Sequence, residues 1–178
     1  MENKNWNEEW ERKLVPIEVT ERIVVRPSFK EYDAAENQIV LIIDPKMSFG
    51  TGEHQTTKLM LQLLEIYIKP DSKILDVGSG TGILSIAAAK LGAAKVIAVD
   101  NDELCYENGI ENVNNNNVGK IVEVKIGEIE SEIILTESKV LISDIEKFLK
   151  TNPYLILANK ESSNIPHSRY ITGDSDAM

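Results

Sequence analysis

The stretch that most constrains the fold is KILDVGSGTGILSIAAAKLGAAKVIAVD, residues 73–100. Residues 73–77 and 95–99 are short β-branched runs that predict two strands, and the alanine-rich residues 83–91 predict a helix that ends at Gly92. A strand, a helix and a second strand at this spacing form a βαβ unit, whose strands are parallel and joined by a right-handed crossover. The chain is therefore expected to be an α/β protein.

Three glycines, Gly78, Gly80 and Gly82, separate the first strand from the helix. They remove Cβ atoms just where the helix N-terminus offers unpaired N–H groups, so a ligand can approach the backbone closely. Asp100 follows the second strand, where a carboxylate can accept hydrogen bonds from both hydroxyls of a ribose. The G-x-G-x-x-G dinucleotide fingerprint fails, because no glycine stands at its last position whichever glycine begins it.

The upstream region predicts two strands and a helix. Residues 21–26 and 38–43 are β-branched runs separated by a turn-rich segment, which predicts an antiparallel pair or a hairpin with a long loop. Residues 56–68 carry apolar side chains at helical spacing and predict an amphipathic helix. Its apolar residues are Leu59, Met60, Leu63, Leu64 and Tyr67.

Downstream of Asp100, the pattern predicts a helix over residues 102–112 and a third strand over 121–126. Two later apolar runs, residues 139–143 and 154–158, predict buried strands with a helical turn at 145–149 between them. The polar last residues, 161–178, are expected to form a disordered or atypical tail.

Composition limits the classes of function. The chain has 178 residues, which suits one domain, and a net charge of -10, which disfavours direct nucleic-acid or anionic-membrane binding and favours a basic partner. Cys105 is the only cysteine, so an internal disulfide is excluded. The charged N-terminus and the absence of a long apolar run predict a soluble cytoplasmic protein.

His54 invites a metal-ligand or general-base role. Its only companion, His167, lies in the tail at no recognisable ligand spacing, so we expect no metal and a loop histidine that contacts its neighbours. Thr56 and Thr57, which follow it, are also candidates for the N-cap of the helix.

Taken together, DPKMSFGTGEHQTTKLMLQLL and the βαβ stretch resemble the PrmA family of ribosomal protein methyltransferases, which are class I enzymes that use S-adenosyl-L-methionine. The upstream WNEEWERKLVPIEVTERIVVRPSF is similar to the segment that joins that family's recognition domain to its catalytic domain. The resemblance covers residues 5–127. It implies a Rossmann-like three-layer sandwich with a largely parallel sheet, and methylation of lysine and N-terminal amines of a large-subunit ribosomal protein.

The resemblance also implies site roles. Thr57 is similar to the family's hydroxyl contact to the cofactor, Gly78 with Gly80 and Gly82 to its glycine-loop contact, and Asp100 to its ribose ligand. The family's loop over the cofactor matches Phe49, Gly50, Thr51, Gly52 and His54. Glu128 stands where the family often has an aspartate near the adenine.

The acceptor side leaves two alternatives. The family's acceptor-side Asn lies at a strand end, and here composition favours Asn159 whereas spacing from Gly127 favours Asp144. Residues 1–45 are expected to form a linker and β-hairpin, and residues 46–160 the cofactor-binding domain, whose sheet is expected to be incomplete at its C-terminal end. A methyltransferase-like domain that binds cofactor or a partner without catalysis is the competing interpretation.

Overall fold

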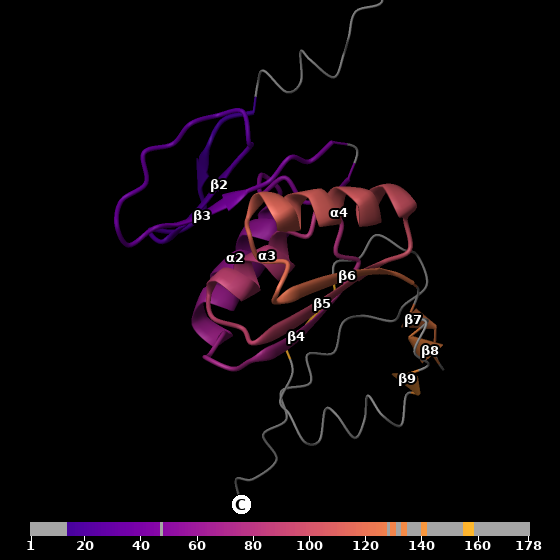
Figure 1. Ribbon diagram of the computed structural model, residues 1–178. Helices are drawn as coiled ribbons and strands as arrows, with labels where there is room; N and C mark the ends of the chain where they lie inside the picture. The colour runs from indigo at the N-terminus through magenta and orange to yellow at the C-terminus, as the bar shows by residue number, and fades with distance from the viewer. Residues whose placement is uncertain are drawn as a thin grey trace, which may run out of the picture.

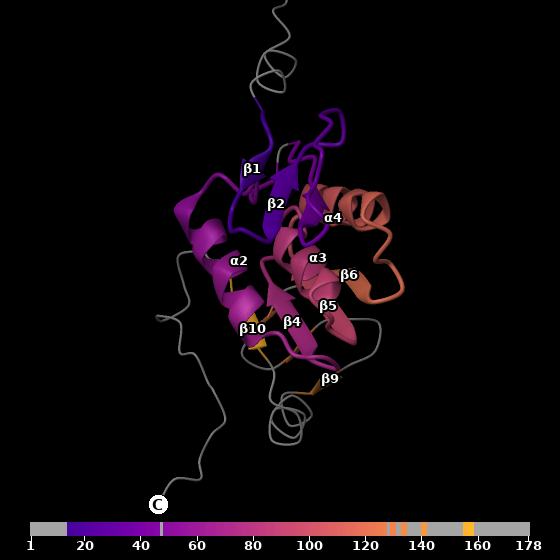
Figure 2. The ribbon, with the colours of Figure 1, turned by 90° about the vertical axis from the view of Figure 1, so that its left-hand side faces the viewer.

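The computed structural model describes residues 14–46 and 48–127, together with the backbone of four short strands further along the chain. Its central sheet has the strand order β10-β4-β5-β6 (Figures 1 and 2), and all neighbouring strands are parallel. The strands are β4 (Lys73–Val77), β5 (Lys95–Asp100), β6 (Val122–Ile126) and β10 (Leu155–Ala158). The four strands predicted at these positions are confirmed.

The position of β4 inside the sheet determines where a ligand can bind. β4 has β5 on one side and β10 on the other, so the strand order reverses at β4. In α/β proteins, ligands bind outside the carboxyl ends of the strands at such a reversal. Those ends carry Gly78, which follows β4, and Asp100, which ends β5.

Three helices, α2 (Gln55–Tyr67), α3 (Ile83–Lys90) and α4 (Glu103–Asn115), lie on one face of this sheet (Figures 1 and 2). Residues 83–89 of α3 are all buried, since the helix lies between the sheet and its neighbours α2 and α4. The alanines of α3 permit this close approach because they carry no long side chains. The predicted Rossmann-like α/β fold is confirmed.

The helix predicted over residues 56–68 is confirmed as α2, but its predicted apolar face is right only at Leu64, which is buried, and at Met60, which packs against the core. Leu59 and Tyr67 are 55% and 57% exposed, whereas Thr57, Leu61 and Leu64 are buried. The buried stripe follows an i, i+4, i+7 spacing that starts at the threonine, because this face packs against α3.

A separate N-terminal sheet contains β1 (Ile17–Glu18), β2 (Ile23–Arg26) and β3 (Ile39–Ile42). A hairpin does precede the central sheet, but β1 and β2 form it, and β2 pairs with β3 in parallel. The prediction of an antiparallel pair over 21–26 and 38–43 is therefore wrong. Residues 27–38 return along the sheet, so β3 starts at the same end as β2, as a parallel connection requires.

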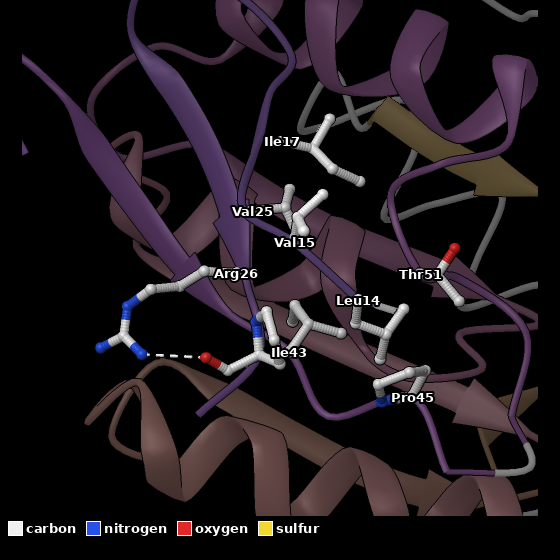
Figure 3. A pocket seen from close by; sticks show the side chains of 9 residues that line it. Leu14, Val15, Ile17, Val25, Arg26, Ile43, Pro45 and Thr51 are labelled. Atoms are coloured by element: carbon white, nitrogen blue, oxygen red, sulfur yellow. Dashed lines mark hydrogen bonds between the residues drawn. The ribbon is translucent and has the colours of Figure 1, made fainter. Parts of the chain in front are cut away.

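Both sheets contribute to one hydrophobic core. Ile23, Leu41, Leu61, Ile86 and Val96 are fully buried members of the same cluster. Beside it, residues in and next to the N-terminal sheet line a small cavity together with Pro45 and Thr51. Its volume of about 10 Å³ has room for about one water molecule (Figure 3). This cavity is too small for a nucleoside ligand.

Past Gly127, three short strands form an antiparallel sheet of order β7-β8-β9. They are β7 (Ile129–Glu130), β8 (Ile133–Ile134) and β9 (Val140–Leu141). The strand expected over residues 139–143 is present as β9, but it pairs antiparallel with β8. The helical turn predicted at 145–149 and the tail at 161–178 lie outside the described residues. Among the described residues, no helix is long and apolar enough to cross a membrane.

Candidate functional site

The glycine loop, residues 78–82, closes over the carboxyl ends of β4 and β5. The amides of Gly78 and Ser79 both donate to the Val99 carbonyl, at 2.8 and 3.1 Å. Gly80 and Gly82 have φ angles of 53° and 77°, in the left-handed region that favours glycine. Gly82 is also the N-cap of α3, so the loop leads directly into the N-terminal turn of that helix.

Asp100 links the end of β5 to the glycine loop. Its Oδ2 accepts a hydrogen bond from the Gly80 amide at 2.8 Å, and its Oδ1 accepts one from the Asp102 amide at 3.1 Å. The residue is 9% exposed. Each carboxylate oxygen can accept more than one hydrogen bond, so Asp100 is oriented by the backbone and keeps acceptor capacity for ligand hydroxyls.

We call residues 44–46 and 48–52 the FGTG segment. It contacts the glycine loop at Thr81, whose amide donates to the Phe49 carbonyl at 3.0 Å and whose hydroxyl donates to the Gly50 carbonyl at 2.8 Å. A Cβ atom on Gly80 would overlap the Phe49 carbonyl oxygen, and one on Gly50 would lie 2.6 Å from Thr81 Oγ1. The structure therefore brings together the two glycine clusters that the sequence separates.

The FGTG segment leads into α2 through His54. The His54 side chain is the N-cap of α2 and accepts from the Thr56 amide at 3.3 Å, with Nδ1 2.7 Å from Thr56 Oγ1. Its ring meets that of Phe49 edge-on at 5.4 Å between centroids. The expectation of a histidine that contacts its neighbours is confirmed, whereas the N-cap role considered for Thr56 and Thr57 is wrong because His54 provides the cap.

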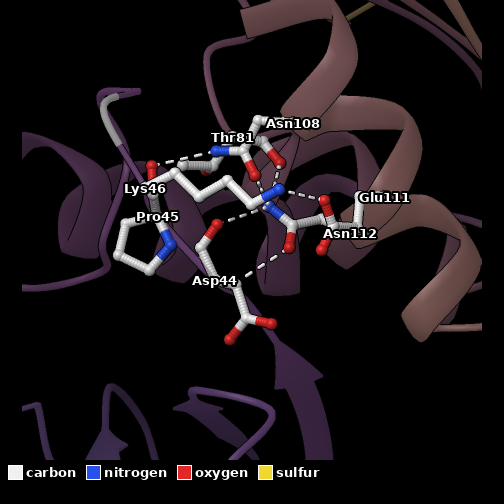
Figure 4. A network of polar contacts seen from close by, with 7 residues as sticks. All are labelled: Asp44, Pro45, Lys46, Thr81, Asn108, Glu111 and Asn112. Atoms are coloured by element: carbon white, nitrogen blue, oxygen red, sulfur yellow. Dashed lines mark hydrogen bonds and ion pairs between the residues drawn. The ribbon is translucent and has the colours of Figure 1, made fainter. Parts of the chain in front are cut away.

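An asparagine ladder runs along α4 to its C-cap: Asn108, Asn112 and Asn116. Asn108 and Asn112 hold the other side of the FGTG segment (Figure 4). Asn108 donates to the Pro45 carbonyl at 2.9 Å, and Asn116 exchanges two hydrogen bonds with the backbone of Ile42. All three side chains are buried. The sequence interpretation missed them; their i, i+4 and i+8 spacing places them on one face of a helix but does not show that this face is buried.

Asp76 lies beneath the glycine loop and is fully buried. Its Oδ2 accepts from the Ser85 hydroxyl at 2.7 Å. Burial raises the pKa of Asp76 to about 6, the Ser85 hydrogen bonds oppose the shift, and the nearby Asp100 carboxylate adds to it. The site therefore contains one carboxyl group that titrates near neutrality.

Three buried side-chain oxygens of α2, β4 and the glycine loop have no hydrogen-bond partner among the described residues: Thr57 Oγ1, Asp76 Oδ1 and Ser79 Oγ. Buried polar atoms are nearly always paired, so these unpaired atoms suit a polar ligand. Together with Asp100 they offer carboxylate and hydroxyl groups to a ligand that carries ribose hydroxyls and an amino-acid moiety. The described residues thus fit S-adenosylmethionine.

Other parts of the expected site are not described. Glu128, Asn159 and Asp144 lie outside the described residues. The described part of the chain holds no group of three or more His, Cys, Asp or Glu side chains placed to bind a metal ion. A larger hollow of about 290 Å³ lies at the starts of β5 and β6, the opposite end of the sheet from the glycine loop.

Comparison with known proteins identifies the family. A family model described as ribosomal protein L11 methyltransferase (PrmA) matches residues 1–158. Ribosomal protein L11 methyltransferases of Chlorobaculum parvum and Chlorobaculum tepidum are each 47% identical, over 75% and 76% of this chain. The crystal structure of a ribosomal protein L11 methylase from Lactobacillus delbrueckii subsp. bulgaricus aligns with a TM-score of 0.56 at 33% identity.

These matches also define how much of a relative the chain represents. The alignments span 46% and 47% of the two Chlorobaculum proteins, so the chain spans about half the length of the curated relatives it matches. The alignment to the Lactobacillus structure covers 62% of this chain and 56% of that one. On the strength of the family match and the 47% identity, the chain belongs to the ribosomal protein L11 methyltransferase family.

Proposed function

We propose that this chain binds S-adenosyl-L-methionine and acts as a protein N-methyltransferase on a basic ribosomal protein in the cytoplasm. The observation that carries the proposal is Asp100, which the Gly80 amide orients at the carboxyl end of β5. The unpaired buried oxygens of Thr57, Ser79 and Asp76 support the same ligand. The relatives' names, L11 methyltransferase, support the substrate class.

The proposed roles follow the chemistry of each group. Asp100 accepts hydrogen bonds from the ribose hydroxyls, and the Thr57 hydroxyl donates a hydrogen bond to the cofactor. The glycine loop, Gly78 with Gly80 and Gly82, provides close backbone approach, and Phe49 and Gly50 cover the ligand from the FGTG segment. Glu128 is proposed to lie near the adenine.

The bound cofactor supplies an activated methyl group, so the protein has to position a neutral acceptor amine rather than provide a nucleophile or a metal. An acceptor lysine must lose its proton from an ordinary pKa near ~10.4. We propose Asn159, with Asp144 as the alternative, as the acceptor-side residue. An Asn oxygen would orient the amine, whereas a carboxylate would hold the ammonium form longer and slow the reaction.

A calorimetric titration with S-adenosylmethionine tests cofactor binding. We expect saturable binding by the unmutated chain and a loss of at least about tenfold in affinity in Asp100→Asn, since one acceptor becomes an amide donor. Asp102→Asn is the matched control, because asparagine preserves the α4 cap and the Asp100 contact to Gly80 is untouched. No saturable binding by the unmutated chain would refute the proposal.

Transfer of a radiolabelled methyl group tests catalysis. The unmutated chain should label a ribosomal protein of the large subunit in ribosomes that carry no methyl groups. Binding without any transfer would mean that this chain is a cofactor-binding domain and that the catalytic part of the proposal is wrong.

A further inference from the structure

Asn112 connects the two loops of the candidate site. Its Oδ1 accepts from the Asp44 amide at 2.9 Å, and its Nδ2 donates to the carbonyls of Asp44 at 3.2 Å and Thr81 at 3.0 Å. The side chain is completely buried. One amide group therefore bonds both the first residue of the FGTG segment and the glycine loop (Figure 4).

These bonds close a ring of contacts. Asn112 and Asn108 hold the start of the FGTG segment, at the backbone of Asp44 and Pro45. Thr81 holds the far part of the segment, at the carbonyls of Phe49 and Gly50. Because Asn112 also bonds Thr81, the segment is fixed relative to the glycine loop at both of its ends.

This ring of contacts depends on Asn112 Nδ2 being a hydrogen-bond donor. The carbonyls of Asp44 and Thr81, and Asn108 Oδ1 at 3.4 Å, face Asn112 Nδ2 and need a donor. At a buried position, no solvent molecule replaces a lost donor without rearrangement. An acceptor in place of Nδ2 would repel both carbonyls. We expect the FGTG segment to move away from the glycine loop in such a variant.

We propose that Asn112 is a positioning residue for the cofactor: it sets the distance between the FGTG segment and the glycine loop, the two elements that we propose contact the ligand. This inference rests on the proposed function. Asn116 provides the matched comparison, since its side chain is buried and bonds the backbone of Ile42 and the Asn112 carbonyl, not the glycine loop.

The experiment compares Asn112→Asp with Asn116→Asp. Each change keeps the accepting Oδ1 and replaces the donor with an oxygen, so we expect similar losses in the free energy of unfolding. At a temperature where circular dichroism shows both variants folded, only Asn112→Asp should lose affinity for S-adenosylmethionine, by about tenfold. Its affinity should partly recover as the pH falls, because a protonated buried carboxyl regains one donor.

The inference about Asn112 is overturned if the two variants have equal affinities, or if Asn112→Asp keeps the affinity of the unmutated chain. In either case, binding by the unmutated chain would still support the proposed function. If no protein in the series binds S-adenosylmethionine, both fail. Should either aspartate variant not fold, Asn112→Ser and Asn116→Ser repeat the comparison without a buried charge, with the same loss expected for the former alone.

Discussion

The glycine loop and the FGTG segment meet at Thr81, but different parts of the chain hold them in place. The glycine loop bonds Val99 and Asp100, at the end of the next strand of the same βαβ unit. The FGTG segment bonds Asn108 and Asn112, more than sixty residues further along the chain. Apart from the contacts of Thr81, the support of the glycine loop thus lies within one short motif, whereas the FGTG segment depends on a helix that its own sequence does not reveal.

The most severe test changes the point where both loops touch. Gly80→Ala combines a left-handed φ with a Cβ that would overlap the Phe49 carbonyl, so we expect a loss of about 2–5 kcal/mol in unfolding free energy and no measurable cofactor binding. The measurements are urea denaturation and calorimetry.

Gly92→Ala is its control. Gly92 has a φ of 110°, but no atom lies within 4 Å of the Cβ that it would acquire. The control should therefore show only the cost of backbone strain, about 1–3 kcal/mol, and normal binding. If both variants lost binding equally, the contact between the loops would not matter.

A change beneath the glycine loop should alter the pH dependence of stability. The Asp76 pKa rises from 3.8 to about 6 on folding, so the native state holds this proton more tightly than the unfolded chain. The associated stability is complete below about pH 4 and is lost as the pH rises through about 6, by about 1–3 kcal/mol. Asp76→Asn should remove that decline, and denaturation measured from pH 4 to pH 8 tests this. If the unfolding free energies of the variant and the unmutated protein changed in parallel with pH, the prediction would be contradicted.

Thr57→Val tests the side of the site next to α2. The Thr57 hydroxyl is buried without a partner among the residues that the structure describes, so its removal should leave the free protein equally stable or more stable, by up to about 1 kcal/mol. Affinity for S-adenosylmethionine should fall about three- to tenfold if this hydroxyl bonds the ligand. Thr57→Ser, which keeps the hydroxyl, is the control for binding. Unchanged affinity in Thr57→Val would remove Thr57 from the proposed site.

The smallest effect is expected at the surface of the FGTG segment. Lys46 and Glu111 form an ion pair with side chains 53% and 45% exposed, and such pairs contribute little. Glu111→Gln should lower stability by less than about 0.5 kcal/mol and leave cofactor affinity within twofold. A larger loss of affinity would mean that the ion pair, and not the buried asparagines, sets the position of the segment.

Local patterns predicted much of the fold. The strands at residues 73–77 and 95–99 and the helix after the glycine loop follow from β-branched runs, glycine positions and helical spacing, which act over a few residues. The pairing of β2 with β3 did not follow, because the direction of a strand depends on the path of the connection and not on the strand's own residues.

The candidate site, like the fold, could be predicted from the sequence only in part. Asp100 and the glycines were predicted correctly as neighbours, since they end adjacent strands. The asparagine ladder was not predicted, because each of its asparagines resembles an ordinary polar residue of an exposed helix until the helix is packed against β3 and the FGTG segment.

The partners of the ladder are backbone atoms: the amides of Ile42 and Asp44, and the carbonyls of Ile42, Asp44, Pro45 and Thr81. Pro45 has no N–H, but its contact with the ladder uses only its carbonyl oxygen, which proline shares with every residue. Substitutions at these partner positions can therefore accumulate without a matching change in α4. Correlated substitution between α4 and the FGTG segment should accordingly be weak, even though the two are physically coupled.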